Sequence, residues 1–263
     1  MELHLIDIGA NLTDKTFRHD LEDVLVRAKR ARVNHIVVTG TDLEHSQRAV
    51  DLCNLHSDYL SSTAGIHPHN ASSVHKQSIQ QLTQIAGNTC VVAIGETGLD
   101  YFRNFSPRSD QISAFETQLQ LAVELRLPVF IHDRDSNGEL LTILKNFSNL
   151  SAVIHCFTGS ASLLQDYLDL GLYIGITGWI CDERRGQELY QCISLIPDDR
   201  LLMETDSPYL IPRSMKPRPR SRRNEPAFLE HVCFTIAAAR GQSAEHIRHI
   251  TQENAKTLFG LAF

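Results

Sequence analysis

The sequence predicts a (β/α)8 barrel, an α/β fold of the metallo-dependent hydrolase type in which eight parallel strands alternate with helices. Three observations support this prediction. Apolar β-type runs alternate with helical patterns eight times, no linker or low-complexity break interrupts the 263 residues, and several apolar runs end in a polar residue. A doubly wound open sheet is the competing fold, but no glycine-rich phosphate loop follows the first strand. We therefore expect a single domain covering residues 1–263.

The first half of the chain is predicted to hold four strand–helix units. Thr41–Glu44 has the spacing of a capping box, which predicts that a helix begins at Leu43. The fourth strand is a continuous apolar run that begins at Cys90 and ends abruptly at Glu96. The expected strands are 3–8, 35–40, 59–66 and 90–96, and the expected helices are 21–32, 43–57, 77–86 and a segment around 112–123.

The second half continues the same alternation. The distances between polar strand ends fit it, because Glu96 to His132 spans 36 residues and His132 to His155 spans 23, each close to one strand–helix unit. His155 to Asp206 spans 51 residues, which corresponds to two units with one strand between them. The expected strands are 128–132, 151–157, 171–177 and 201–206, and the expected helices are 140–147, 162–170, 184–195, 225–239 and 244–259.

Composition and charge narrow the function classes. The chain is 42% hydrophobic and 21% charged, as in an ordinary globular protein. A formal net charge of -6 gives no global attraction to nucleic acid, so such a partner requires a local basic patch. Six scattered cysteines without CxxC spacing favour free thiols in a reducing compartment. Without a secretory-type amino terminus or an apolar run long enough to span a bilayer, we expect a cytoplasmic protein with no membrane partner.

Four apolar runs end in an acid or a histidine, at Glu96, His132, His155 and Asp206. In a barrel these positions lie at the mouth formed by the carboxyl ends of the strands. Imidazole nitrogens and carboxylate oxygens suit a divalent cation, so we predict a metal site built from these four residues. Glu96 and Asp206 are the predicted catalytic carboxylates, and Asp206 is either a ligand or the general base for a metal-bound water. Glu204 is expected either to support a ligand or to form an interior ion pair.

Basic and imidazole side chains around the same mouth are the candidate substrate contacts. His67 ends the third strand, and it either contacts the substrate or a second metal, or caps a turn. Cations at the mouth would hold a phosphate backbone without reading its base sequence. Charged loops are also often only solvated, and Arg223 lies at a loop-to-helix junction that it could simply stabilise. Arg184 and Arg185 follow the seventh strand, and Arg213, Lys216, Arg218, Arg220, Arg222 and Arg223 follow the eighth. We predict substrate contacts for Arg184, Arg185, Arg222 and Arg223.

Five segments spread along the chain carry a family resemblance. They are GIHPH at 65–69, IGETGLD at 94–100, HCFTG at 155–159, ETDSPYL at 204–210 and RNEP at 223–226. Together, and in this order, they resemble the signature blocks of the TatD family of metal-dependent deoxyribonucleases, and CDERRG at 181–186 resembles the bacterial members. The resemblance implies Mg²⁺-type phosphodiester hydrolysis, with 3′–5′ exonuclease action on single strands. It also matches Glu96, His132 and His155 to metal ligands, Asp206 to the carboxylate of the eighth strand, and His67 to a pocket histidine.

One segment departs from the family pattern. Most of the wider family has Asp-x-His-x-His after the first strand, whereas this chain has Asp7, Gly9 and Asn11. Glycine offers no ligand and an amide is a weaker ligand than imidazole, which favours loose binding of Mg²⁺ over tight binding of Zn²⁺. Mg²⁺ is therefore the predicted cofactor, with Mn²⁺ and Zn²⁺ as alternatives.

The leading hypothesis is a monomeric 3′–5′ exonuclease that acts on single-stranded DNA, and on RNA as a further substrate, in DNA repair or degradation. Two alternatives stay open at this point. The same barrel and metal chemistry could serve a small-molecule amidohydrolase or lactonase, since a fold does not fix a function. A barrel without the histidine pair could also bind nucleic acid without cleaving it, although the intact Glu96, His132, His155 and Asp206 set argues against this.

Overall fold

A computed structural model describes residues 4–147, 150–217 and 219–262, and its elements follow the predicted alternation closely. The eight strands form one sheet in which they are ordered as in the sequence, from β1 to β8. The chain divides into two compact units, each described on its own below. Unit 1 comprises residues 1–37 and 156–263, and unit 2 comprises residues 38–155.

The described part of the chain contains the following elements. The strands are β1 Leu5–Ala10, β2 Val33–Val38, β3 Leu60–Ala64, β4 Val91–Asp100, β5 Val129–Arg134, β6 Ala152–His155, β7 Tyr173–Ile176 and β8 Leu201–Met203. The α-helices are α1 Leu21–Arg30, α2 Leu43–Leu55, α3 Lys76–Ala86, α4 Arg108–Leu125, α5 Glu139–Leu144, α6 Ala161–Asp169, α7 Gln187–Cys192, α8 Leu229–Arg240 and α9 Ala244–Phe259. Short 3-10 turns are η1 Lys15–Phe17, η2 Pro68–Ser73, η3 Gly178–Cys181, η4 Ile193–Leu195 and η5 Pro226–Phe228.

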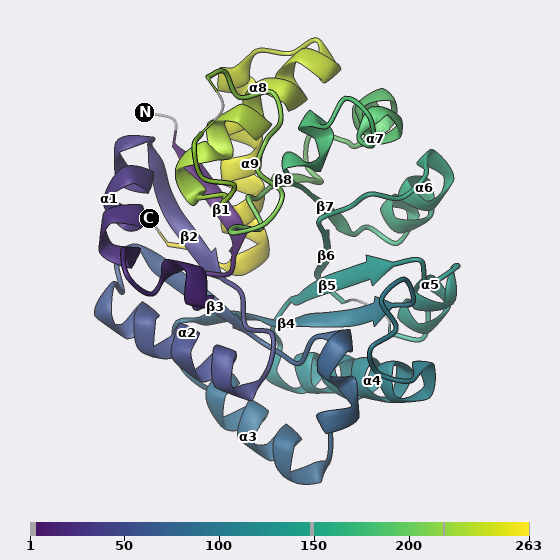
Figure 1. The fold of residues 1–263 in the computed structure, drawn as a ribbon. Coiled ribbons are helices and arrows are strands. Elements are labelled where there is room, and N and C mark those ends of the chain that lie inside the picture. Colours follow the sequence, from purple (N-terminus) through teal and green to yellow (C-terminus); the bar gives the residue numbers. More distant parts are fainter. Residues whose placement is uncertain (1–3, 148–149, 218, 263) are drawn as a thin grey trace. The chain divides into compact units, whose positions relative to one another are not determined.

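Unit 2 is built on the parallel strands β3 to β6. The apolar residues of β4, β5 and β6 are buried on both faces, which is why these strands begin as apolar runs in the sequence, whereas β3 buries the polar side chains of Ser61, Ser62 and Thr63. Helices α2, α3 and α4 pack against this part of the sheet (Figure 1). Helix α2 begins at Leu43 as predicted, but its cap is Asp42, whose side chain accepts a hydrogen bond from the backbone of His45 at 2.7 Å. Asp is among the strongest N-cap residues, so it takes the role that the capping-box pattern gave to Thr41.

Strand β4 is longer than predicted, because it continues past Glu96 to Asp100. Between Gly95 and Thr97 the pairing with β5 shifts by one residue, so Glu96 lies in a β-bulge. A bulge re-aims the side chain that it carries. Further along, Gly98 has a φ of +140°, and a Cβ there would lie 1.9 Å from the carbonyl oxygen of His132. Gly95 and Gly98 therefore let β4 run close beside β5, while Glu96 leaves the regular residue-to-residue pairing of the two strands.

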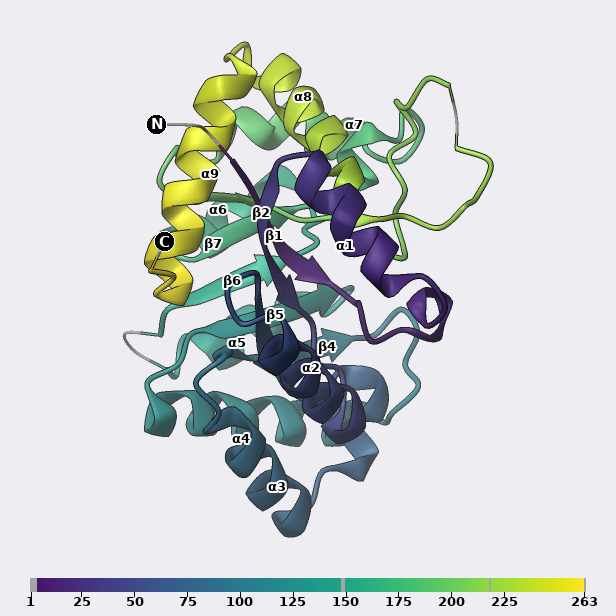
Figure 2. The same cartoon turned by 90° about the vertical axis from the view of Figure 1, so that its left-hand side faces the viewer.

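Unit 1 contains β1, β7 and β8 with helices α1 and α6 to α9. Helix α9 packs against β1, β8 and α8 (Figure 2). Strand β8 is shorter than predicted, since it ends at Met203 instead of Asp206. Asp206 has a φ of +52°, outside the extended region, so the chain has already left the strand there. A bridge between Ala10 and Ser207 connects this segment to the end of β1.

Two helices of unit 1 also begin later than predicted. Helix α7 begins at Gln187 because the Asp182 side chain accepts hydrogen bonds from the backbone of Arg184 and Arg185, which fixes a turn there. Pro226 opens the 3-10 turn η5, so α8 begins at Leu229. All six cysteines are free thiols, as predicted. None of the helices in the described ranges combines the length and apolarity that a membrane crossing requires.

Candidate metal centre

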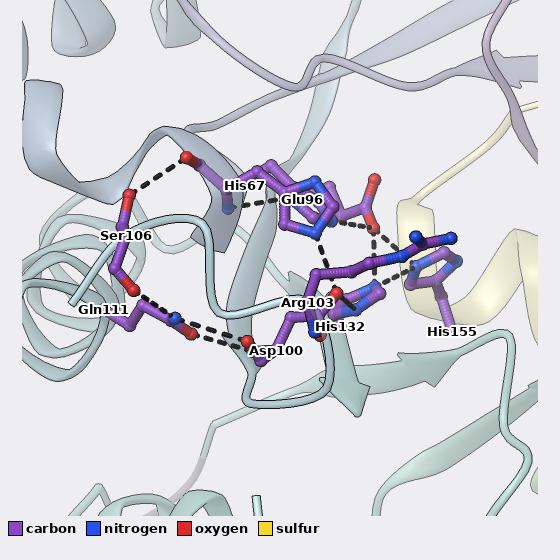
Figure 3. Close-up of polar contacts among 9 residues, drawn as sticks. His67, Glu96, Asp100, Arg103, Ser106, Gln111, His132 and His155 are labelled. Carbon is purple, nitrogen blue, oxygen red and sulfur yellow. Dashed lines mark hydrogen bonds and ion pairs between the residues drawn. The ribbon is translucent and has the colours of Figure 1, made fainter. Parts of the chain in front are cut away.

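Three imidazole rings converge on a single carboxylate oxygen in unit 2 (Figure 3). Glu96 Oε1 lies 2.7 Å from His155 Nε2, 3.0 Å from His132 Nδ1 and 3.2 Å from His67 Nε2. The four side chains come from four neighbouring strands or the segment that follows one of them. Glu96 projects from the bulge of β4, His132 and His155 are direct register partners on β5 and β6, and His67 follows β3. The sequence-based grouping of Glu96, His132, His155 and His67 at one end of the strands agrees with this geometry.

Burial and mutual charge set the protonation of these groups. Burial by itself raises the pKa of Glu96, but its interactions with His155, His67 and His132 outweigh burial and hold that pKa well below its usual value. For His132, burial lowers the pKa, and contacts with Asp100 and Glu96 raise it above its usual value. Burial dominates at His67 and lowers its pKa to about 4. The cluster therefore holds an ionised carboxylate beside a neutral His67 at neutral pH.

The tautomer of His67 follows from its second ring nitrogen. His67 Nδ1 accepts a hydrogen bond from the backbone N–H of His69 at 3.1 Å, so Nδ1 carries no proton. In a neutral imidazole the proton then resides on Nε2, the atom that faces Glu96. His67 thus caps the turn η2 and also presents an N–H to the cluster, which combines the two alternatives that the sequence left open. It is a hydrogen-bond donor in this geometry.

Asp100 is part of the cluster, and the sequence analysis gave it no role. Its Oδ2 lies 2.8 Å from His69 Nε2 and 3.5 Å from His132 Nε2, while Oδ1 accepts a hydrogen bond from the backbone of Arg103. Burial raises the pKa of Asp100, but His132 and His69 lower it well below the usual range. The carboxylate therefore orients the His132 ring, with Nδ1 directed toward Glu96. Such carboxylate–histidine pairs typically hold a metal-ligating imidazole in place.

Asp100 closes the block IGETGLD that also contains Glu96, and this is its signal in the sequence. Alternation along the strand does not relate the two residues, because the bulge at Glu96 breaks the two-residue period. The bulge and the continuation of β4 could not be read from the apolar run alone, because the polar residues after Glu96 resemble the start of a loop.

The donor set fits a divalent cation. Donor atoms of His67, Glu96 and His132 all lie within 4.8 Å of one another, and His155 Nε2 contacts the same carboxylate oxygen. Mixed nitrogen and oxygen donors suit Zn²⁺, Mn²⁺ or Mg²⁺ more than a soft metal. Because the His67 proton is on Nε2, the residues best prepared to coordinate are Glu96, His132 and His155, three of the four ligands that the sequence predicted.

Asp206 belongs to unit 1, in the segment that follows β8. Asn11 Nδ2 donates a hydrogen bond to Asp206 Oδ1 at 3.0 Å, and the Asp206 backbone N–H donates to the Gly9 carbonyl at 2.8 Å. The two residues that replace the family's histidine pair are therefore both in contact with Asp206. Its predicted roles as metal ligand and general base stay predictions.

The neighbours of Asp206 are fixed by buried polar contacts. Asp7 accepts hydrogen bonds from the backbone and the hydroxyl of Thr205 at 2.9 and 2.6 Å, and burial is the main reason that its pKa is raised to about 7. Asn224 donates to the Thr205 carbonyl at 2.9 Å. Glu204 accepts a hydrogen bond from the backbone of Cys156 at 2.6 Å. Glu204 and Asp206 both lie beyond β8, which ends at Met203, and the two predicted roles of Glu204 stay predictions.

The predicted substrate arginines have different surroundings. Arg184 and Arg185 are exposed, and both contact the buried carboxylate of Asp182. Arg222 is exposed to solvent. Arg223 instead forms ion pairs with Asp20 at 2.7 Å and Glu225 at 2.8 Å. Of the other predicted basic residues, Arg213 contacts Asp182 and Glu183, and Arg218 lies outside the described residues. Substrate contacts of Arg184, Arg185, Arg222 and Arg223 stay predictions.

Comparison with known proteins places these features in context. The family model of TatD related DNase matches residues 6–260. A protein of Erwinia amylovora named 3′-5′ ssDNA/RNA exonuclease TatD is 50% identical over 259 residues, covering 98% of this chain and 100% of the relative. A protein of the same name from Pectobacterium atrosepticum is 49% identical over 260 residues, again with 98% and 100% coverage.

Solved structures agree with the predicted fold. A hydrolase of the TatD family from Entamoeba histolytica superimposes with a TM-score of 0.90 at 28% identity, covering 98% of this chain and 99% of that one. The TatD homologue YJJV from Escherichia coli gives a TM-score of 0.90 at 29% identity with complete coverage of both chains. An amidohydrolase from Saccharomyces cerevisiae, at 23% identity and a TM-score of 0.88, shows the fold alone. The predicted family and (β/α)8 barrel are confirmed, and the chain belongs to the TatD related DNase family.

Proposed function

We propose that this protein is a metal-dependent 3′–5′ exonuclease that acts on single-stranded DNA and on RNA, with Mg²⁺ as the metal. The observation that carries the proposal is the convergence of His67, His132 and His155 on Glu96. It is supported by a relative that is 50% identical to this chain and is named for this activity. Gly9 and Asn11, which replace the family's histidine pair beside Asp206, offer weaker ligands than imidazole, and this favours loosely bound Mg²⁺ over tightly bound Zn²⁺.

Glu96, His132 and His155 are the proposed metal-holding residues, and Asp206 is the proposed fourth carboxylate. A bound divalent cation supplies Lewis acidity to the scissile phosphate and lowers the pKa of a water molecule. Asp100 keeps the His132 ring oriented through its contact with Nε2. Burial of Glu96 and His155 limits competing contacts with water.

In the proposed reaction, His67 donates a hydrogen bond and Asp206 accepts a proton. His67 Nε2–H faces Glu96 in the structure, and we propose that a bound strand offers it a non-bridging phosphate oxygen as the alternative acceptor, which requires the neutral tautomer that the His69 backbone contact fixes. Asp206 accepts a proton from the attacking water, and Asn11 holds one of its oxygens in position. The alternative of an amidohydrolase or lactonase rests on the fold alone and is not favoured by any of these contacts.

The proposal is tested by digesting single-stranded DNA and RNA labelled at either end, with Mg²⁺ and with EDTA. We expect the 3′ label to be released first, EDTA to stop the reaction, and added Mg²⁺ to restore it. His155→Ala should abolish activity, whereas the matched variant His249→Ala, which changes an exposed histidine of α9, should not. Cleavage that starts at the 5′ end, persists in EDTA, or occurs only with neutral amides or lactones would contradict the proposal.

A further inference from the structure

The segment Tyr101–Ser106, here called the aromatic loop, follows β4 and exposes two large aromatic side chains. Phe102 is 57% exposed and Phe105 is 68% exposed. Both belong to unit 2, as does the candidate metal centre. Exposed phenylalanines contribute little to folding, so two of them in one short loop indicate a surface that contacts something else.

The aromatic loop is held rigidly from both ends. Buried Gln111 bonds the backbone N–H and C=O of Asp100 and donates to the Ser106 carbonyl at 2.8 Å. Ser106 Oγ donates to the His69 carbonyl at 2.9 Å, and the Tyr101 backbone donates to the Arg134 carbonyl at 2.9 Å. The rings are therefore displayed on a fixed backbone, which reduces the entropy lost when a ligand binds.

The aromatic loop also adjoins the candidate metal centre. The Phe105 ring centroid lies 4.7 Å from that of His69, and His69 Nε2 contacts Asp100 at 2.8 Å. The His69 ring in turn lies 4.2 Å from the His67 ring. A continuous row of rings thus leads from Phe105 to the imidazole that faces Glu96.

Cationic groups surround these aromatic rings. The Arg134 guanidinium carbon lies 4.2 Å from the Phe102 ring centroid, that of Arg103 lies 5.7 Å from it, and that of Arg108 lies 4.2 Å from the Tyr101 ring. Within the described ranges none of these three arginines forms an ion pair, in contrast to Arg223. Their charges are therefore available to an anionic ligand, which argues against an apolar partner.

We propose that Phe102 and Phe105 form a stacking platform for the unpaired bases of a single-stranded nucleic acid, with Arg103 and Arg134 contacting its phosphates. The inference rests on the proposed nuclease function and assigns to that site a binding surface that selects single strands. Bases of a duplex are covered by their neighbours, whereas unpaired bases can stack on a phenyl ring. Aromatic rings interleaved with arginines are the arrangement that sequence-tolerant single-strand binding requires.

The test compares two labelled oligonucleotides of equal length in EDTA, an oligo-dT and an abasic strand with the same phosphates. Fluorescence anisotropy gives the dissociation constant of each for the wild type, for a Phe102→Leu/Phe105→Leu variant, and for Phe234→Leu. Leucine keeps the apolar character but removes the flat face. Phe234 is a matched control, because it lies on α8, is 48% exposed and has Arg248 5.6 Å from its ring.

We expect the wild type and Phe234→Leu to prefer the base-bearing strand. The double variant should bind oligo-dT at least about fivefold more weakly, in line with the loss of one stacked base, and should bind the abasic strand as before. Arg134→Gln should weaken binding to both strands and flatten the slope of log affinity against log salt by about 0.7.

The outcomes separate this inference from the function on which it rests. An unchanged preference in the double variant, or no preference in a wild type that cleaves DNA, overturns the platform and leaves the nuclease function intact. A wild type that neither binds nor cleaves nucleic acid overturns both. Light scattering tests one more outcome. If the wild type is an oligomer, the double variant is a smaller species and the preference for the base-bearing strand is unchanged, the surface is a self-association interface and the platform is wrong.

Discussion

Two clusters of acidic and basic side chains in this protein differ in what their basic groups can do. In unit 2, Glu96 faces three imidazoles, which can lose a proton and offer a lone pair. In unit 1, Asp20 and Glu225 face Arg27 and Arg223, whose guanidinium groups stay protonated and have no lone pair to offer. The first cluster can therefore hold a metal, whereas the second can only form ion pairs. A cluster of charged side chains does not by itself distinguish a reactive site from a structural one.

The ion-pair cluster supports the segment that carries Asp206. Arg223 also donates to the carbonyl of Thr16 and lies 4.8 Å from the Phe17 ring centroid. The neighbouring Asn224 holds the carbonyl of Thr205. The motif RNEP thus joins η1, the start of α1 and the loop after β8. Its contacts are those of a structural clamp, and they give Arg223 a role that Arg222 lacks.

The largest expected effect separates the two clusters by their acids. Glu96→Ala should lower nuclease activity by orders of magnitude and leave the circular dichroism spectrum unchanged, because it removes a proposed metal ligand. Glu225→Ala, the matched change in the other cluster, should mainly lower the melting temperature, because two arginines lose a partner. Near-full activity in purified Glu96→Ala would rule out its role in the metal centre.

The next effect concerns Asp206. Asp206→Asn keeps the shape of the side chain and should still bind single-stranded DNA, but turnover should fall by about 10²–10⁴-fold if the carboxylate accepts the proton of the attacking water. Asp20→Asn is the matched control, and it should affect stability instead of turnover. Unchanged turnover in Asp206→Asn would make this residue a structural one.

Asp100 should have a smaller effect that depends on metal concentration. Asp100→Asn weakens the orientation of His132, so the Mg²⁺ concentration at half-maximal activity should rise by about 10–100-fold. Saturating Mg²⁺ should restore much of the lost activity. This recovery distinguishes a positioning role from a structural one, since a misfolded protein would not respond to the metal.

Arg222 and Arg223 are adjacent but should respond differently. Arg222→Gln should flatten the salt dependence of DNA binding by about 0.7 without changing the melting temperature, because its side chain is exposed. Arg223→Gln should cost about 1.5–3 kcal/mol of unfolding free energy, the usual range for hydrogen bonds to charged groups. Equal effects of the two variants on the salt slope, without a change in stability, would contradict the clamp.

The smallest effect is the acid sensitivity of the ion-pair cluster. The hydrogen bond with Arg223 is the main reason that the pKa of Asp20 is lowered from 3.8 to about 2. A lowered pKa contributes stability that is present above pH 3.8 and is lost as the pH falls toward 2. The melting temperatures of wild type and Asp20→Asn should therefore differ at pH 7 and converge between pH 4 and 2. A constant difference across this range would show that the Asp20 charge is not involved.

Much of the fold, and the grouping of three of the proposed metal ligands, were accessible from the sequence. Apolar runs buried on both faces of a parallel sheet, and helices with one apolar stripe, leave periodic signals that do not depend on distant residues. The polar residue at the end of each run then indicates which end of the sheet carries chemistry. Glu96, His132 and His155 follow from this reasoning alone, and the family blocks add the nuclease hypothesis.

The tertiary structure decided what depends on contacts between segments that are distant in sequence. It shows that β4 bulges at Glu96 and continues to Asp100, and that Gly95 and Gly98 leave room there for the close approach of β5. It sets the tautomer of His67 through a backbone N–H, and it pairs Arg223 with an acid some 200 residues away. Residue type sets which interactions a side chain is able to make, and the partner that the fold brings to it determines which one it makes.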